Sequence, residues 1–194
     1  MTAGKSRAAR YRRRVPSTAA AARRSLLPGD WAVLALLAEA PAHGFALSRV
    51  LAEDGELGQV WTMPRPRVYR AIDDLREAGL IQAVETSPSA RGPNRTVFVA
   101  TAAGALAIEQ WLAKPVAHVR EARSELLLKL VLTQRAGRDL RPLAAAQLGV
   151  LDQLVDKLSG RLGDADEQQG LVLRFRLAQA KAARDYVSEL LAAL

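Results

Sequence analysis

The stretch from Trp31 to Ala100 constrains the fold most, because three helical periods, a glycine stop and a strand–loop–strand pattern follow one another in it. Apolar residues recur at helical spacing in three segments, at 31–38, 42–51 and 66–75. Gly79 follows the third segment, where the C-cap of a helix is expected. Two β segments, 80–86 and 96–100, then flank a loop with Pro, Gly and Asn. This order predicts a winged helix-turn-helix, an architecture that mostly places one short helix in a DNA groove.

Capping residues predict where the helices begin. Asp30 is expected to cap the first helix after Pro28-Gly29, and Thr101 to cap the helix that follows the wing. The second helix is expected to start at His43 or Gly44, and the third near 64–66, where proline is tolerated in a first turn. The residues predicted to face the core are Phe45, Leu47, Val50 and Leu51 in the second helix, Val68, Ala71, Ile72 and Leu75 in the third, and Leu106, Ile108, Trp111 and Leu112 in the fourth.

The chain beyond residue 113 is predicted to be helical. Its last segment, from about 167 to the end, carries an apolar stripe whose spacing of three and four residues matches the seam of paired helices. The residues of this stripe predicted to form a dimer interface are Leu171, Phe175, Ala178, Ala182, Tyr186 and Leu190. The predicted fold class is therefore mainly α with a small β-wing: a basic, disordered arm (1–29), a winged helix-turn-helix (30–113) and a helical dimerisation domain (114–194).

The net charge of +8 belongs to the arm and not to the folded body. Of the 28 basic and 20 acidic residues, eight basic and no acidic ones lie in 1–29, which leaves 20 of each sign in the rest. The arm is predicted to follow phosphates or to enter a minor groove. The alternatives are a solubilising tail or an incorrectly assigned start. Nucleic-acid binding by the body must depend on where its charges lie.

Composition also excludes several classes of site. Cysteine is absent, and the only two histidines, His43 and His118, are far apart, so no metal site or cofactor is expected. His43 is interpreted as a capping or packing residue, and Asp73, Asp74 and Glu77 as a solvated face that forms ion pairs. No nucleophile elbow or phosphate-binding glycine loop occurs, so no enzyme is predicted. No apolar run is long enough to cross a membrane, and a cytoplasmic location is expected.

Residues 30–113 resemble the PadR family of bacterial transcriptional regulators. The motifs that carry the resemblance are Leu34-Ala-Leu-Leu, Ala42-His-Gly-Phe-Ala-Leu, Val68-Tyr-Arg-Ala-Ile, Ala78-Gly-Leu-Ile, Gly92-Pro-Asn-Arg, Phe98-Val-Ala-Thr and Trp111-Leu. Phe98 departs from the family pattern, which commonly has a tyrosine nearby, and the arginine-rich extension is not part of it. The C-terminal part resembles the longer branch of the family in architecture. The resemblance implies a homodimeric repressor, or less often an activator, whose C-terminal helices exchange between subunits and which binds a small molecule between its two parts.

Seven residues are predicted to contact double-stranded DNA. Arg65 and Arg67 lie in the first turn of the presumed recognition helix, where side chains reach base edges and arginine reads guanine. Tyr69 is expected to meet a phosphate, as such tyrosines do in the resembling family, and Arg70 a backbone phosphate. The wing residues Arg91, Asn94 and Arg95 are expected along or in a minor groove. For each, the alternative is a solvated charge or, for Tyr69, packing against the wing.

Two further predictions concern partners. Trp61, Trp111 and Phe175 are candidate walls of a pocket for a small, flat, apolar effector, the alternative being that they are core residues. The predicted function is a sequence-specific regulator that binds a pseudo-palindromic operator as a homodimer and is released by such an effector. The alternative function is a winged helix that binds proteins, with only non-specific nucleic-acid binding through the arm.

Overall fold

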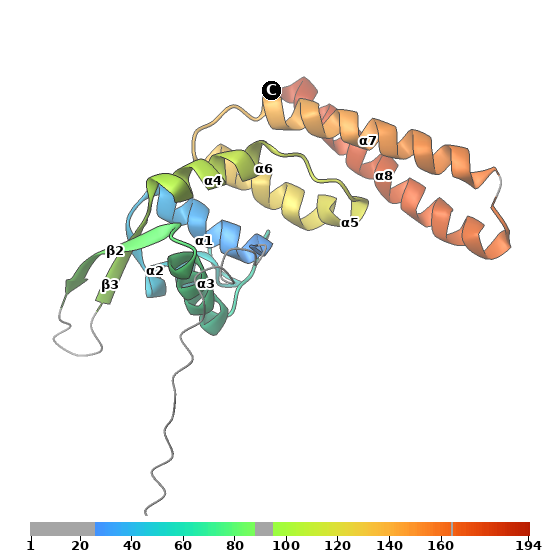
Figure 1. Cartoon of the computed structure of the whole chain (residues 1–194). Helices are drawn as coiled ribbons and strands as arrows, with labels where there is room; N and C mark the ends of the chain where they lie inside the picture. The colour runs from blue at the N-terminus through green and yellow to red at the C-terminus, as the bar shows by residue number, and fades with distance from the viewer. Residues whose placement is uncertain (1–25, 88–94, 164) are drawn as a thin grey trace, which may run out of the picture.

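The computed structural model describes residues 26–87, 95–163 and 165–194. Most of the predicted arm, and Arg91 and Asn94 at the predicted wing tip, lie outside these ranges. The described chain has a winged helix at one end and a long helical hairpin at the other (Figure 1). The predicted fold class, mainly helical with a small β-wing, is confirmed.

The winged helix contains the predicted elements in the predicted order, with one strand added. Its elements are α1 (Pro28–Glu39), β1 (Ala42–His43), α2 (Gly44–Val50), α3 (Arg65–Glu77), β2 (Ile81–Ser87), β3 (Arg95–Ala100) and α4 (Ala102–Ala113). Gly79 has a φ of 71°, the left-handed conformation that ends α3 as predicted. The hydroxyl of Thr101 accepts a hydrogen bond from the Gly104 N–H at 3.1 Å and caps α4, also as predicted.

The start of α1 differs from the prediction. The helix begins at Pro28 and not after Asp30, because proline fits the first turn, where no intrahelical partner for its nitrogen is needed. Asp30 lies inside this first turn and is only 3% exposed. Its carboxylate accepts the N–H of Leu27 at 2.8 Å. The prediction that Asp30 is the N-cap is therefore wrong, although the residue still satisfies a free N–H at the helix start.

The sheet is antiparallel and has the strand order β1-β3-β2. The sequence predicted only the β2–β3 hairpin, because the two residues of β1 are too few to give an alternating pattern. In the structure Ala42 pairs with Phe98 and His43 with Val97. This pairing fixes the start of α2 to the base of the wing.

Two of the residues predicted to lie in the core of the winged helix are exposed instead. The core of the winged helix is built on α1, which is buried from Ala32 to Leu37, and on Val68, Ala71, Ile72 and Leu75 of α3. Phe45 and Leu106 were expected in this core but are 51% and 59% exposed. The seven-residue α2 contributes Leu47 to the core and leaves Phe45 outside.

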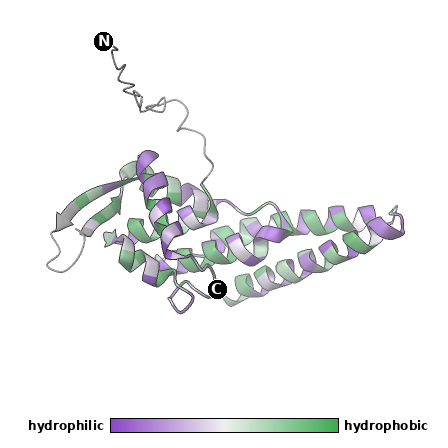
Figure 2. Ribbon diagram, turned by 90° about the horizontal axis from the view of Figure 1, so that it is seen from below, coloured by the Kyte–Doolittle hydropathy of each residue, from purple (hydrophilic) through white to green (hydrophobic). Residues whose placement is uncertain are grey.

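The C-terminal part is helical, as predicted. Its elements are α5 (Val119–Glu121), a π-helical turn η2 (Ala122–Leu126), α6 (Leu127–Arg135), α7 (Arg141–Leu162) and α8 (Glu167–Ala193). The last two form the hairpin that projects from the rest of the molecule (Figures 1 and 2). Leu173, Ala180 and Val187 of α8 are buried, the first two beside Val155 and Leu158 of α7.

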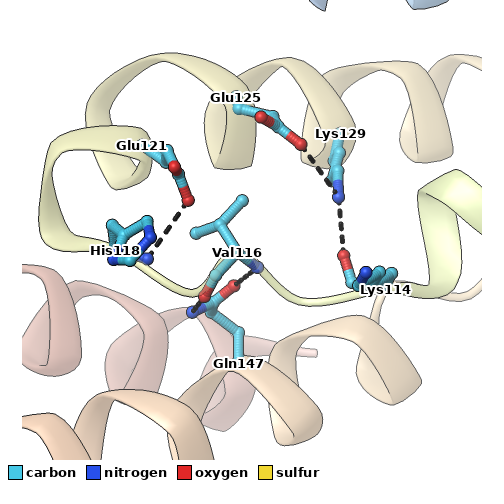
Figure 3. A network of polar contacts seen from close by, with 7 residues as sticks. All are labelled: Lys114, Val116, His118, Glu121, Glu125, Lys129 and Gln147. Carbon is cyan, nitrogen blue, oxygen red and sulfur yellow. Dashed lines mark hydrogen bonds and ion pairs between the residues drawn. The ribbon is translucent and has the colours of Figure 1, made fainter. Parts of the chain in front are cut away.

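Buried polar side chains fix the segment that joins the two parts (Figure 3). The amide of Gln147 on α7 accepts the Val116 N–H at 2.8 Å and donates to the Val116 carbonyl at 3.1 Å. Lys129 on α6 is 2% exposed, donates to the Lys114 carbonyl at 2.6 Å and lies 3.3 Å from the Glu125 carboxylate. Burial lowers the pKa of Lys129 below its usual value, and the neighbouring Glu125 opposes this shift. The joining segment is therefore held to the C-terminal helices by side chains from two of them.

Candidate nucleic-acid interface

The N-terminal end of α3 is exposed next to the N-terminal end of α2. Pro64 caps α3, with Arg65 as its first residue. The ring of Tyr69 lies against the backbone of Gly44, where a Cβ atom would come within 2.8 Å of the ring. A larger residue at position 44 would therefore require the Tyr69 ring to shift. Tyr69 thus packs on α2, and 40% of it stays exposed.

Arg65 lies close to two aromatic rings. Its guanidinium carbon is 5.4 Å from the centre of the Phe45 ring and 5.6 Å from that of Tyr69. Such cation–π contacts orient a guanidinium without neutralising it. Within 26–87, 95–163 and 165–194, no carboxylate forms an ion pair with Arg65. Its charge and its hydrogen-bond donors are thus available to a ligand at the start of α3.

Arg67 has a different environment, which argues against its predicted base contact. Its Nη2 lies 2.5 Å from the Asp30 carboxylate, and the two side chains are 27% and 5% exposed. Asp30 is turned inward by the first turn of α1, so Arg67 is drawn toward the core to neutralise it. This salt bridge ties α3 to α1, and the base contact predicted for Arg67 remains a prediction.

Of the other residues predicted to contact DNA, only Arg70 and Arg95 lie within the described part of the chain. Arg70 is exposed on α3, one residue beyond Tyr69. Asp73 and Arg76 form an exposed pair at 3.5 Å, as expected for a solvated face. The backbone of Arg95 pairs with Ser87 where the hairpin leaves the described chain, and the hairpin and α3 both lie away from α7 and α8 (Figure 1).

The three aromatic residues predicted to wall one effector pocket do not come together. Trp111 stacks on Trp31 of α1 with ring centres 5.4 Å apart, and Lys129 Nζ lies 4.6 Å from its ring centre. Trp61 packs against the same winged-helix core. Phe175 is on α8, in the other part of the molecule. Within the single chain the three residues therefore share no pocket. Trp61 and Trp111 pack against the core, which was the alternative, and the effector pocket remains a prediction.

Phe175 instead lines an open cavity of about 650 Å³ between α8 and the segment that runs from α5 to α6. Its other lining residues include Ala182 and Tyr186 of α8, with Arg120 and Arg123 on the opposite side. The π-helical turn η2 contributes Ala122 and Leu126 to this cavity. Sequence reasoning did not find this cavity, because its two sides are far apart along the chain.

Five of the six residues predicted for the dimer interface lie exposed on α8, and Leu190 is partly buried. Leu171 and Phe175 are 66% and 65% exposed, and Tyr186 is 46% exposed. The helix packs on α7 through other residues, Leu173, Ala180 and Val187. The apolar stripe therefore stays uncovered in the single chain.

No arrangement typical of an enzyme is formed by these residues. The Nδ1 atom of His43 accepts the Ala46 N–H at 2.9 Å, so His43 is a helix cap, as interpreted from the sequence. Throughout the described ranges, no three His, Cys, Asp or Glu residues are grouped so that they could hold a metal ion. No described helix is long and apolar enough to cross a membrane.

A short third helix with an exposed arginine at its start, next to a β-hairpin, has the architecture of a winged helix-turn-helix. Residues 33–110 match the model of the transcriptional regulator PadR-like family. The predicted resemblance to this family is thus confirmed over the winged helix, the part of the chain that the family model covers.

Two solved structures are similar to this chain. PadR of Bacillus subtilis, in a crystal structure with operator DNA, is 19% identical with a TM-score of 0.45, over 88% of this chain and 99% of that one. The protein smu.1604c of Streptococcus mutans UA159 is 19% identical with a TM-score of 0.42, over 86% and 99%. Comparison of the sequence with curated proteins gave no match.

Proposed function

We propose that this protein is a sequence-specific repressor that acts in the bacterial cytoplasm and binds a pseudo-palindromic operator as a homodimer. The observation that carries the proposal is Arg65, exposed at the start of α3 and without a carboxylate partner in the described chain. A guanidinium in this position forms two hydrogen bonds with guanine O6 and N7. Tyr69 and Arg70 on α3, and Arg91, Asn94 and Arg95 of the wing, are proposed to contact the backbone and the minor groove.

The uncovered face of α8 supports the homodimer. Leu171, Phe175 and Tyr186 expose apolar surface that a partner would bury, and burial of apolar surface favours association by about 25 cal/mol per Å². A second copy brings a second α3. Two-fold symmetry then predicts half-sites about 10 base pairs apart, centre to centre, or a multiple of that.

Release by a small apolar effector is part of the proposal, although the aromatic residues predicted for its pocket do not converge. It rests on the family resemblance. Screening flat apolar compounds by thermal shift tests this part: a compound that raises the melting temperature and weakens operator binding supports it. The absence of any such compound from a broad aromatic panel would count against it.

The DNA-binding proposal is tested by fluorescence anisotropy on the DNA upstream of the protein's own gene, with excess random DNA and a salt series. We expect the full chain, and a version lacking residues 1–24, to prefer the specific DNA. We also expect Arg65→Ala to relax that preference. Removing the arm should instead weaken all sequences and reduce the salt slope. Equal displacement by random DNA, with binding lost along with the arm, would favour a protein-interaction module.

A further inference from the structure

Phe45 is an exposed aromatic residue with no explanation in the packing of the protein. It is the second residue of α2 and 51% of it is exposed, whereas the core residue Leu47 on the same helix is 2% exposed. An exposed phenylalanine keeps apolar area in contact with water, and covering that area with a ligand is favourable. Its ring is part of the surface that contains Arg65 and Tyr69.

The ring of Phe45 has the ring of His43 as a neighbour. His43 caps α2 through its Nδ1 atom, and its ring centre lies 6.3 Å from that of Phe45. The second ring near Arg65, that of Tyr69, lies against the backbone of Gly44. The guanidinium of Arg65 is therefore held by two rings that two different helices supply. Rigid support of this kind lowers the entropy cost of ordering an arginine when it binds.

We propose that Phe45 is a specificity-determining residue of the DNA-binding surface. It holds the Arg65 guanidinium from one side and places its own ring against the methyl group of a thymine next to the guanine that Arg65 reads. This inference rests on the proposed DNA-binding function. It adds a residue from α2 to a contact set that was predicted from α3 and the wing alone.

The chemistry of the major groove selects the thymine methyl as the partner. Base edges there present hydrogen-bond donors and acceptors, and the one apolar group among them is the C5-methyl of thymine. A phenyl ring offers no hydrogen bond, so it discriminates between bases through this group. The neighbouring arginine covers the polar edge of guanine, and together the two side chains would read two adjacent base pairs.

Removal of single methyl groups from the DNA tests the proposed contact. The full-length protein first selects duplexes from a randomised library, and each thymine of the selected duplex is then replaced in turn by deoxyuridine, which lacks only the methyl group. For the unmodified protein we expect one thymine per half-site at which deoxyuridine weakens binding about fourfold, the value of one buried methyl group. With Phe45→Ala this discrimination should vanish, while the other thymines behave as before.

A double-mutant cycle tests whether Phe45 supports Arg65. Phe45→Ala should reduce the preference for guanine at the Arg65 position, and the combined Phe45→Ala and Arg65→Ala change should cost less than the product of the two single effects. Leu106→Ala is the matched control, because Leu106 is an equally exposed apolar side chain on α4, outside this surface. It should change neither affinity nor base preference.

Each outcome distinguishes this proposal from the one on which it rests. If the unmodified protein selects no duplex, the proposed DNA-binding function fails. If it selects duplexes but tolerates loss of every methyl group, or if Phe45→Ala retains the discrimination, the role of Phe45 is overturned. Thermal melting of Phe45→Ala serves as a folding check and should match the unmodified protein, since the ring is already half exposed.

Discussion

Two arginines separated by one residue on α3 have opposite environments. Arg65 lies close to two rings with its charge available, whereas Arg67 is paired with a buried carboxylate. Local sequence gives them equal standing, because both lie in the first turn after a proline. The difference comes from α1, because its first turn brings the Asp30 carboxylate within salt-bridge distance of Arg67 but not of Arg65.

At the residue scale, Asp30→Ala should destabilise the protein by about 2–4 kcal/mol. The substitution leaves the partly buried Arg67 charge and the Leu27 N–H without their partner. Urea unfolding followed by circular dichroism measures the change. Asp73→Ala is the control, since its pair with Arg76 is exposed and worth about 1 kcal/mol or less. Equal losses for the two variants would contradict this account.

Lys129 gives a prediction on pH at the same scale. Burial lowers its pKa in the folded protein below the unfolded value of 10.5, so the unfolded chain binds more protons in the window just below 10.5. The cost of the buried charge is fully present at lower pH and is relieved as pH rises through that window. The free energy of unfolding should therefore rise with pH relative to Lys129→Met.

The matched control for this comparison is Lys157→Met, which changes an exposed lysine on α7. Unfolding of all three proteins in urea at pH 7 and at pH 10 gives the differences. A gap between the unmodified protein and Lys129→Met that stays constant or widens in favour of methionine would contradict the assignment.

At the scale of elements, the segment between α4 and α5 decides how the winged helix is attached to the C-terminal helices. It has no regular structure of its own, and its backbone groups are satisfied by Gln147 and Lys129 (Figure 3). Both side chains come from helices that follow later in the chain. A shift of α6 or α7 would therefore also displace the joining segment and, with it, the C-terminal end of α4.

Gln147→Leu should destabilise the protein by about 2–4 kcal/mol. Leucine leaves the buried N–H and carbonyl of Val116 unpaired, and each such group costs about 1–3 kcal/mol. Chemical unfolding measures the loss, and Gln153→Leu on the exposed face of α7 is the control, expected within about 0.5 kcal/mol of the unmodified protein. A neutral effect of Gln147→Leu would mean that other groups satisfy the joining segment.

At the scale of the whole molecule, the surface proposed to bind DNA and the surface proposed to bind a second copy lie on different parts of the chain. Arg65 and Phe45 lie on the winged helix, and Leu171, Phe175 and Tyr186 lie on the projecting hairpin. This separation lets one surface associate with a second copy while the other remains free for DNA. Affinity for a two-part site would then depend on association through α8.

The combined change Leu171→Asp and Phe175→Asp should give a folded monomer. Charges on the α8 face oppose burial against a partner. Loss of the second copy's DNA-binding surface should weaken operator binding at least about a hundredfold. Light scattering gives the mass, and circular dichroism checks the helices. Ser188→Asp adds one such charge to an exposed residue outside the stripe and should remain dimeric. A double variant that keeps the mass of a dimer would place the interface elsewhere.

The sequence by itself determined the winged helix, its order of elements and most of its core. These follow from periodicity, capping residues and Gly79, which act over a few neighbouring positions. The apolar stripe on α8 could also be predicted from the sequence, because helical spacing puts its residues on one face whatever the helix packs against.

Tertiary structure alone decided the role of individual side chains. It paired Arg67 with Asp30, exposed Phe45 beside Arg65, packed Trp61 and Trp111 against the core, and buried Lys129 and Gln147 against the joining segment. Each outcome depends on a partner far away in sequence, and periodicity says which face is apolar but not what lies opposite it.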